Sequence, residues 1–296
     1  MSSASPANTA LRARLLLLCG LVACVLALAV GSWFLARLID SRLLQGEAQQ
    51  ARADLDQELS RLRFFPRVLA DDPRLEQALT RGQPADILAA NRSLASISAQ
   101  SGAAFSFLMD PQGETVASSN YDQPTSFIGK NYAFRPYFTQ AMAKGEGTFY
   151  AVGATTGVPG YFLARALSDD VGLTQGVVVV KLDLESFLAR SRAVQNRLLV
   201  ADDLGVLVLS TEPGFLYAPL TPLSDGALSL AEQQRRYVLN PSAVLETRGA
   251  WLRADGSEYL TAQTNSSVEG WTLLALRTRG DVFNRRHEFQ KMFRPG

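Results

Sequence analysis

Apolar residues form one continuous stretch near the start of the chain. Residues 15–36 contain no charged side chain, Arg12 and Arg14 precede them, and no acidic residue occurs before Asp40. An α-helix rises about 1.5 Å per residue, so this stretch would be roughly 33 Å long and would match a bilayer core of about 30 Å. The pattern predicts a transmembrane helix over 15–36, a cytoplasmic tail over 1–14 and a main domain outside the cytoplasm.

Two cleavage sites are alternatives to an uncleaved anchor. Residues 27–29 (Ala-Leu-Ala) have the form of a signal-peptidase site, and residues 21–24 (Leu-Val-Ala-Cys) are similar to a lipoprotein cleavage box. In both cases the apolar run should stop near the cut, but here it continues through Trp33 and Phe34. We therefore expect a single-pass protein of the inner (cell) membrane with its main domain periplasmic or extracellular.

Beyond this anchor, the spacing of apolar residues indicates helices. Leucines recur on one side of residues 40–65 among Arg, Gln, Asp and Glu, which predicts an amphipathic stalk helix. Prolines at 66 and 73 interrupt the pattern, and a second helix is expected over 84–100. The stalk helices thus cover 37–99. The apolar side comprises Leu43, Leu44, Leu55, Leu59 and Leu62.

From residue 105 the pattern changes to that of strands. Four consecutive valines at 177–180 indicate a strand that is buried on both faces. One short helix is expected among the strands, over 138–143. The predicted strands are 105–109, 115–118, 147–152, 161–167 and 176–182.

Two parts of the chain repeat one another at an offset of 92 residues. Residues 109–118 align with 201–210, with matching Asp, Gly, Val and Ser. The Asp starts a turn and the Gly supplies its positive φ. A second match, of Tyr161 and its neighbours with Tyr259 and its neighbours, follows in the same order. The repeat predicts an α+β chain with two tandem modules, over 100–190 and 195–280, and a C-terminal tail over 281–296.

Composition and motifs narrow the function. The net charge of +1 gives no field that would attract nucleic acid. The single histidine, His287, leaves no His-rich metal site and little general-base chemistry. No Gly-x-Ser-x-Gly elbow or P-loop is present. Cys19 and Cys24 both lie in the apolar stretch, so the outer domain has no disulfide. We expect no catalytic residue, metal or cofactor.

The most informative chemistry lies between residues 129 and 181. Arg135 stands among aromatic residues, a Gly-rich loop over 153–157 carries hydroxyls, and Lys181 follows the four valines. Such a set suits a pocket for a small anion. Arg presents a planar fork and Lys a point charge, so two cations favour a ligand with two carboxylates. The simpler alternatives are a surface salt bridge for Arg135, a strand-end position for Lys181, and ordinary core for the tyrosines.

A stalk followed by two such modules resembles the double Cache domain of bacterial sensors, whose modules are PAS-like. The run 131–138 (Asn-Tyr-Ala-Phe-Arg-Pro-Tyr-Phe), the segment ending in Pro-Gly-Tyr at 159–161 and the valine-rich strand ending in Lys181 are similar to the sensor region of four-carbon dicarboxylate sensor histidine kinases of the DctB type. That family senses succinate, fumarate and malate, and controls dicarboxylate uptake through a response regulator. The resemblance implies a membrane-distal, ligand-binding module over 100–190 and a membrane-proximal module over 195–280.

Carried over position by position, the resemblance implies a set of ligand-site residues. Lys181 meets the second carboxylate, a loop hydroxyl comes from Thr155 or Thr156, and Tyr137 and Tyr161 are pocket walls. The full set is Tyr132, Arg135, Tyr137, Thr155, Thr156, Tyr161 and Lys181.

The chain departs from this family at its C-terminal end. Such kinases continue into a second transmembrane helix and a kinase core, neither of which occurs before Gly296. Residues 287–289 (His-Glu-Phe) are only superficially similar to a phosphoacceptor box. We expect a fragment of a two-component histidine kinase, or a stand-alone sensor. Its expected partners are a small dicarboxylate, the membrane, a second copy through the stalk helix, and a separate kinase or signalling protein.

Two other functions stay open. The first is a double Cache sensor for amino acids or another small ligand, although Lys181 stands near the place where the amino-acid pattern has an Asp. The second is a ligand-free, membrane-anchored scaffold.

Overall fold

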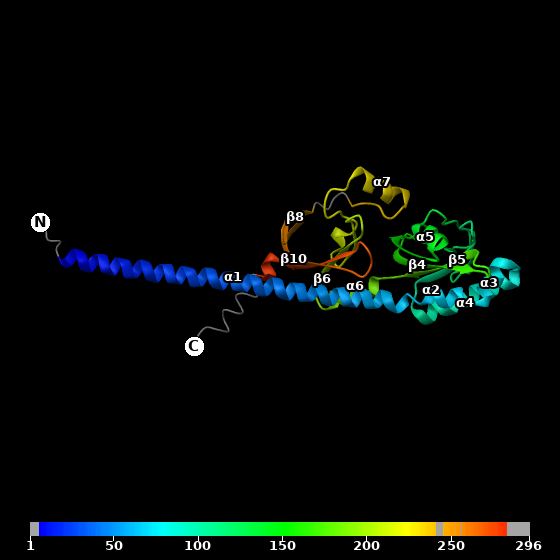
Figure 1. The fold of residues 1–296 in the computed structure, drawn as a ribbon, viewed down its shortest axis with the longest axis horizontal. Helices are drawn as coiled ribbons and strands as arrows, with labels where there is room; N and C mark the ends of the chain where they lie inside the picture. Colours follow the sequence, from blue (N-terminus) through cyan, green and yellow to red (C-terminus); the bar gives the residue numbers. More distant parts are fainter. Residues whose placement is uncertain (1–5, 241–244, 255, 283–296) are drawn as a thin grey trace.

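The computed structural model describes residues 6–240, 245–254 and 256–282. One long helix, α1 (Pro6–Leu62), extends from the N-terminal end, and two α+β modules follow one another along its second half and beyond its end (Figure 1). Within these residues, no helix combines the length and the apolar character needed to cross a membrane. Residues 1–5 of the expected cytoplasmic tail and 283–296 of the expected C-terminal tail, including 287–289, lie outside the described residues.

The second half of α1 packs against the modules. Its buried residues recur every three or four positions, as expected for one face of an amphipathic helix, and they lie against β10 (Ser257–Asn265) and β11 (Thr272–Thr278) of the second sheet. The predicted apolar side is confirmed for the other leucines, but Leu43 is 47% exposed and lies outside the row of buried residues. The buried residues are Leu44, Ala48, Ala51, Leu55, Leu59 and Leu62.

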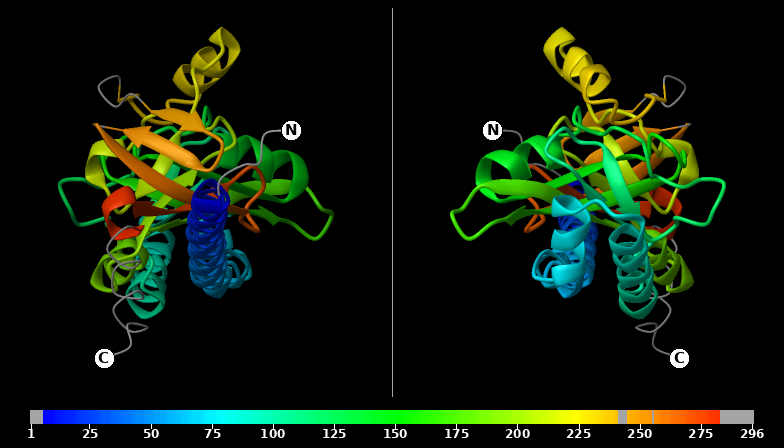
Figure 2. Two further views of the ribbon diagram at one scale, coloured as in Figure 1. Left: turned by 90° about the vertical axis from the view of Figure 1, so that its left-hand side faces the viewer. Right: turned by 90° about the vertical axis from the view of Figure 1, so that its right-hand side faces the viewer.

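The first module contains an antiparallel sheet in the order β2-β1-β5-β4-β3. Helices α2, α3 and α4 cover one face and α5 covers the other, as Figures 1 and 2 show. The four valines of β5 are at most 1% exposed, and they alternate between two clusters of buried side chains on opposite faces of the sheet. The strands are β1 (Phe105–Met109), β2 (Thr115–Ser118), β3 (Glu146–Val152), β4 (Pro159–Ser168) and β5 (Thr174–Leu182). The helices are α2 (Phe65–Ala70), α3 (Pro73–Thr80), α4 (Pro84–Ser101) and α5 (Pro136–Lys144).

The second module repeats this arrangement. Its antiparallel sheet has the order β7-β6-β11-β10-β9-β8, so the first five strands correspond to β2-β1-β5-β4-β3. Both first hairpins carry a register shift, after Leu108 and after Val200, which are 92 positions apart. The strands are β6 (Arg197–Ala201), β7 (Leu207–Ser210), β8 (Glu246–Arg248), β9 (Trp251–Ala254), β10 (Ser257–Asn265) and β11 (Thr272–Thr278). The helical segments are α6 (Glu185–Ala193), η1 (Pro213–Phe215) and α7 (Asp225–Gln233).

The turns of the two first hairpins are also built alike. One carboxylate oxygen of Asp110 accepts the backbone N–H groups of residues 112 and 114, and Asp202 accepts those of residues 204 and 206 in the same way. Gly113 and Gly205 follow with φ of 81° and 77°, a conformation that favours glycine. The predicted α+β fold is therefore confirmed, and each of the two modules contains an antiparallel sheet.

The packing of α1 leads to a test of stability. Leu55→Ala should lower the free energy of unfolding by about 2–5 kcal/mol, because the Leu55 side chain is fully buried and its removal leaves a cavity. Leu43→Ala is the matched control and should change stability by less than about 0.5 kcal/mol. Urea denaturation of the full chain, followed by circular dichroism, measures both values. Equal losses in the two variants would contradict the packing described for α1.

Candidate ligand-binding site

A small cavity lies on the α5 face of the first sheet. Its volume is about 20 Å³, enough for roughly one water molecule. Of the residues expected to bind a ligand, all except Tyr161 line it. The lining consists of Phe107, Phe127, Tyr132, Arg135, Tyr137, Gly153, Ala154, Thr155, Thr156, Phe162 and Lys181.

Arg135 enters the cavity from the start of α5. It precedes Pro136, which disfavours a helical conformation of Arg135, so the helix begins at Pro136 and Arg135 stays extended with φ −80° and ψ 134°. Its guanidinium donates from Nη1 to the carbonyl oxygens of Gln234 (3.0 Å) and Arg235 (2.9 Å), and from Nη2 to that of Val152 (2.8 Å). The side chain is buried, and this burial lowers the pKa of Arg135.

Lys181 enters from the central strand β5. Phe105 of β1 and Phe162 of β4 are its partners in register on either side, and its Nζ lies 5.8 Å from the centre of each ring. The ammonium donates to the carbonyl oxygen of Val158 (2.8 Å) and lies 3.4 Å from Oγ1 of Thr156. Lys181 is 1% exposed, and this burial lowers its pKa to about 8, against a smaller opposing effect of Asp183.

Glycine makes room for the stem of Lys181. A Cβ at position 160 would lie 2.4 Å from Cε of Lys181 and 2.9 Å from its Cγ, which is closer than carbon atoms pack. It would also lie 2.9 Å from the carbonyl oxygen of Leu182. Gly160 therefore lets the lysine side chain lie across β4 toward the 153–158 loop.

Hydroxyl groups and aromatic rings complete the lining. The hydroxyls of Tyr132 and Thr155 lie 2.6 Å apart, within hydrogen-bonding distance. Tyr137 stacks on Phe162 with ring centres 5.1 Å apart. Burial raises the pKa of both Tyr132 and Tyr137, so both phenols are protonated at neutral pH and can donate a hydrogen bond.

Tyr161 lies on the opposite face of β4, so its expected place as a pocket wall needs correction. Successive side chains of a strand point to opposite faces, and Phe162, which pairs with Lys181, takes the cavity side. Tyr161 instead packs edge-on against Trp271 of the second module, at a ring-centre distance of 5.5 Å. This alternation distinguishes Phe162 from Tyr161 already in the sequence, and Phe162 and Phe107 of β1 are two wall residues that were not among the expected site residues.

The two cations lack the partner that a buried charge usually has. In the described part of the chain, neither Arg135 nor Lys181 forms an ion pair with a carboxylate, and backbone carbonyl oxygens satisfy part of their hydrogen bonding. A buried cation without a counter-charge is costly, because it has lost its hydration. The cavity therefore has the electrostatic character of an anion site with positive groups from two separate elements.

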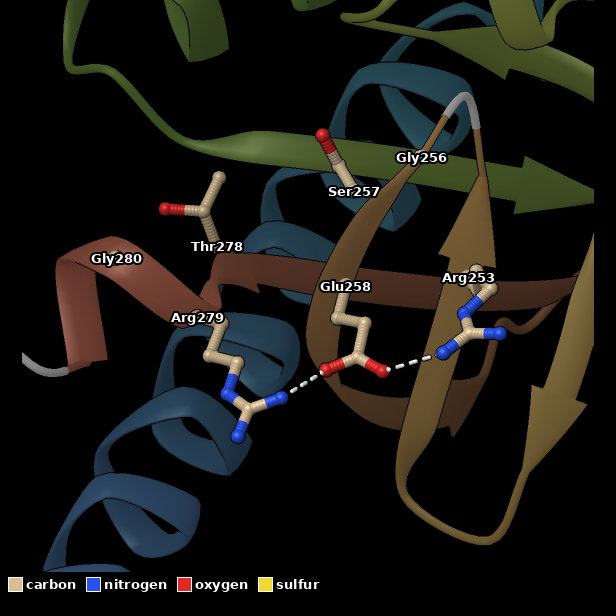
Figure 3. A pocket seen from close by; sticks show the side chains of 7 residues that line it. All are labelled: Arg253, Gly256, Ser257, Glu258, Thr278, Arg279 and Gly280. Atoms are coloured by element: carbon tan, nitrogen blue, oxygen red, sulfur yellow. Dashed lines mark hydrogen bonds and ion pairs between the residues drawn. The ribbon is translucent and has the colours of Figure 1, made fainter.

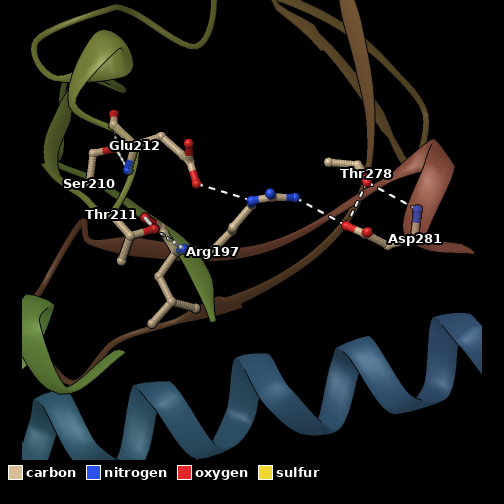
Figure 4. Close-up of polar contacts among 7 residues, drawn as sticks. Arg197, Ser210, Thr211, Glu212, Thr278 and Asp281 are labelled. Atoms are coloured by element: carbon tan, nitrogen blue, oxygen red, sulfur yellow. Dashed lines mark hydrogen bonds and ion pairs between the residues drawn. The ribbon is translucent and has the colours of Figure 1, made fainter. Parts of the chain in front are cut away.

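Several other charged side chains of the second module form ion pairs with one another. Figure 3 shows an open groove in which Glu258 bonds both Arg253, at 3.0 Å, and Arg279. Figure 4 shows Arg197 between Glu212 and Asp281, at 3.1 Å from each. Exposed pairs of this kind contribute roughly 0–1 kcal/mol each. Among the described residues, no group of His, Cys, Asp and Glu could hold a metal ion.

Comparisons with known proteins agree with the resemblance in the sequence. No family model matches the chain. The C4-dicarboxylate transport sensor protein DctB of Rhizobium meliloti is 31% identical over 229 residues, 75% of this chain and 37% of that protein. The protein of the same description from Pseudomonas aeruginosa is 33% identical over 263 residues, 86% of this chain and 41% of that protein. The chain thus spans about two fifths of the length of these relatives.

Solved structures place the fold in the same group. The sensor domain of the histidine kinase DctB from V. cholerae superposes with a TM-score of 0.70 at 26% identity, covering 81% of this chain and 99% of that one. The sensory domain of the Campylobacter jejuni chemoreceptor Tlp3, solved with isoleucine bound, covers 84% of this chain and 96% of its own, with a TM-score of 0.56. At 13% identity it shares the fold alone. The chain therefore belongs, as a double Cache sensor region, to the DctB type of C4-dicarboxylate sensor proteins.

Proposed function

We propose that this chain is an extracytoplasmic sensor of small carboxylates and that its ligand is a four-carbon dicarboxylate such as succinate, fumarate or malate. The observation that carries the proposal is the pair of buried cations, Arg135 and Lys181, which face one cavity without a carboxylate partner among the described residues. A dianion that leaves water needs a charged group at each end, and these two groups stand on separate elements. In this role the chain is the input region of a two-component signalling system.

The proposed ligand contacts follow from the geometry of the cavity. Arg135 meets one carboxylate and Lys181 the other, while the hydroxyls of Tyr132 and of Thr155 or Thr156 donate to the ligand. The cavity of about 20 Å³ is too small for a four-carbon ligand. Binding therefore moves the 153–158 loop outward, and the ligand carboxylate replaces the carbonyl oxygen of Val158 at the ammonium of Lys181.

The proposed topology puts the ligand module far from the membrane. Residues 15–36 form the anchor, 100–190 the membrane-distal module and 195–280 the membrane-proximal module. The charge-free run supports the anchor, as do apolar side chains of α1 such as Leu21 and Leu28, which are 65% and 69% exposed. In Figure 1 the second sheet lies nearer than the first to the N-terminal end of α1. A homodimer through α1 and a separate kinase or signalling partner complete the proposal.

Removing either cation should abolish or strongly weaken ligand binding. Hydrogen bonds to charged groups are worth about 1.5–3 kcal/mol, so Arg135→Ala and Lys181→Ala should each weaken succinate binding by roughly 10- to 150-fold. Arg135→Lys should also fail, because a point charge cannot replace the planar fork. Isothermal titration calorimetry of the full chain in mild detergent measures the affinities, and circular dichroism checks the fold.

The control for these variants is Lys144→Ala, at an exposed position in the last turn of α5, which should bind succinate like the wild type. Unchanged affinity in both alanine variants would remove the proposed site. Tight binding of an amino acid by the wild type would instead favour the amino-acid sensor, and no binding of either class would favour the scaffold.

The affinity should also depend on pH through Lys181. The pKa of Lys181 is about 8 without ligand, so above this pH the ammonium must take up a proton before it can meet a carboxylate. Succinate affinity should thus change little just below about pH 7, where succinate is still a dianion, and fall about tenfold per pH unit well above 8. Calorimetry at several pH values checks this. Lys181→Met should bind weakly with no such fall, and the same fall in that variant would assign the pH dependence to another group.

The close approach at Gly160 gives a steric test of the lysine position. Gly160→Ala should destabilise the chain by about 1–3 kcal/mol, because the added methyl group overlaps the stem of Lys181. In the Lys181→Ala background the same change should cost less, because the overlapping atoms are gone. Gly46→Ala, at an open position in α1, is the control and should not destabilise. Equal costs in both backgrounds, measured by urea denaturation, would mean that Gly160 does not act through Lys181.

A further inference from the structure

A short segment of the second module is bonded directly to the candidate ligand site of the first. This segment comprises residues 234–236 and follows α7, which lies over the junction of the two modules (Figure 1). Its first two carbonyl oxygens accept both hydrogen bonds from Nη1 of Arg135. The carbonyl oxygen of Arg236 accepts the backbone N–H of Val152 at 2.7 Å, at the end of the edge strand β3. The segment thus joins the second module to two points around the cavity.

Arg236 ties this segment to the body of the second module. Its guanidinium bonds Asp202 at 3.2 Å and both carboxylate oxygens of Asp203, and its Nε donates to the side chain of Gln234 at 2.7 Å. The hydroxyl of Tyr237 donates to Asp202 as well, at 2.8 Å. Arg236 is 6% exposed, and its cation also lies 5.1 Å from the ring centre of Phe149 on β3. The segment is therefore held from both sides.

The two repeats differ at this point. Asp110 of the first module and Asp202 of the second both use Oδ1 to organise the hairpin turn. Only Asp202, of these two, forms an ion pair within the described residues, and its Oδ2 receives Arg236 and Tyr237. The turn that both modules share is thus used in the second module as an attachment point for the segment.

The hydrogen bonds of Arg135 show why this matters for a ligand. A guanidinium has five N–H donors, and three of those of Arg135 are taken by the carbonyl oxygens of residues 152, 234 and 235. The remaining two donors, the one on Nε and one on Nη2, equal the number that a bidentate carboxylate uses. The segment thus fixes the orientation of the guanidinium while leaving it this capacity.

We propose that Arg236 is a positioning residue for the ligand site, which fixes the 234–236 segment and through it orients Arg135. The inference rests on the proposed function, since it assigns Arg135 to a ligand carboxylate. The distal site is then incomplete without the proximal module. Because coupling between two equilibria is reciprocal, a clamp that favours ligand binding is itself stabilised by the ligand. Ligand binding in the first module therefore stabilises the contacts of the 234–236 segment with Arg135 and Val152.

The test compares two buried arginines of the second module in the full chain. Arg236→Met keeps the apolar stem and loses the ion pairs, and it should weaken succinate binding about 10- to 100-fold, by analogy with the loss of partners that orient metal ligands. Arg277→Met is the matched control: Arg277 is also 6% exposed and pairs with Glu47 of α1, away from the segment. It should bind succinate like the wild type. Calorimetry measures the affinities, and Arg236→Lys should recover part of the loss.

A second readout separates positioning from mere stability. Succinate should slow hydrogen exchange at the amide of Val152 in the wild type and in Arg277→Met, because this amide bonds the segment, and should not slow it in Arg236→Met. Wild-type affinity in Arg236→Met, or an equal loss in both variants, would overturn the inference. If the wild type itself does not bind succinate, the proposed function fails, which is a distinguishable result.

Discussion

Arg135 and Lys181 bring two positive charges into the interior of the first module, and the local structure around them follows from that constraint. Neither charge is balanced by a carboxylate in the described residues, so backbone carbonyl oxygens provide the hydrogen bonds. These oxygens come from the end of β3, from the following loop and from the 234–236 segment. Their dipoles reduce the cost of burying the cations but do not neutralise them. An anion that enters the cavity can therefore stabilise the two buried cations, whose charge the chain alone does not neutralise.

The same constraint connects the two modules. Of the three carbonyl oxygens that accept hydrogen bonds from Arg135, two belong to the second module and one belongs to the first. Aromatic contacts reinforce this junction, since Tyr150 and Tyr161 both pack against Trp271 and the hydroxyl of Tyr150 donates to the carbonyl oxygen of Val208 at 2.7 Å. A change at Arg135 thus acts on groups that also hold the modules together.

The long helix α1 packs directly against the second module. The second half of α1 buries its apolar stripe against β10 and β11, so the helix and the second module share one hydrophobic core. The polar contacts of Glu47 with Arg277 and of Asp56 with Ser266 lie along the same boundary. A ligand can change the packing around α1 only if it binds one arrangement of the two modules more tightly than another.

Local patterns in the sequence predict the stalk helix, the strands of the first module and the repeat, and a family resemblance implies the site residues. Periodic leucines marked the stalk, and four valines marked the doubly buried strand, because burial of apolar surface follows local periodicity. The 92-residue repeat predicts two similar modules, because similar turn sequences form similar hairpins. The motif over residues 131–138 and the isolated lysine resemble a known family, and this resemblance implies that Arg135 and Lys181 belong to one ligand site. The contact of Tyr161 with Trp271 and the hydrogen bonds from Arg135 to residues 234 and 235 depend on how the chain folds in three dimensions. The contacts of Arg135 with residues 234 and 235 join positions about 100 apart through backbone carbonyl groups, which every residue carries and which leave no pattern in a sequence.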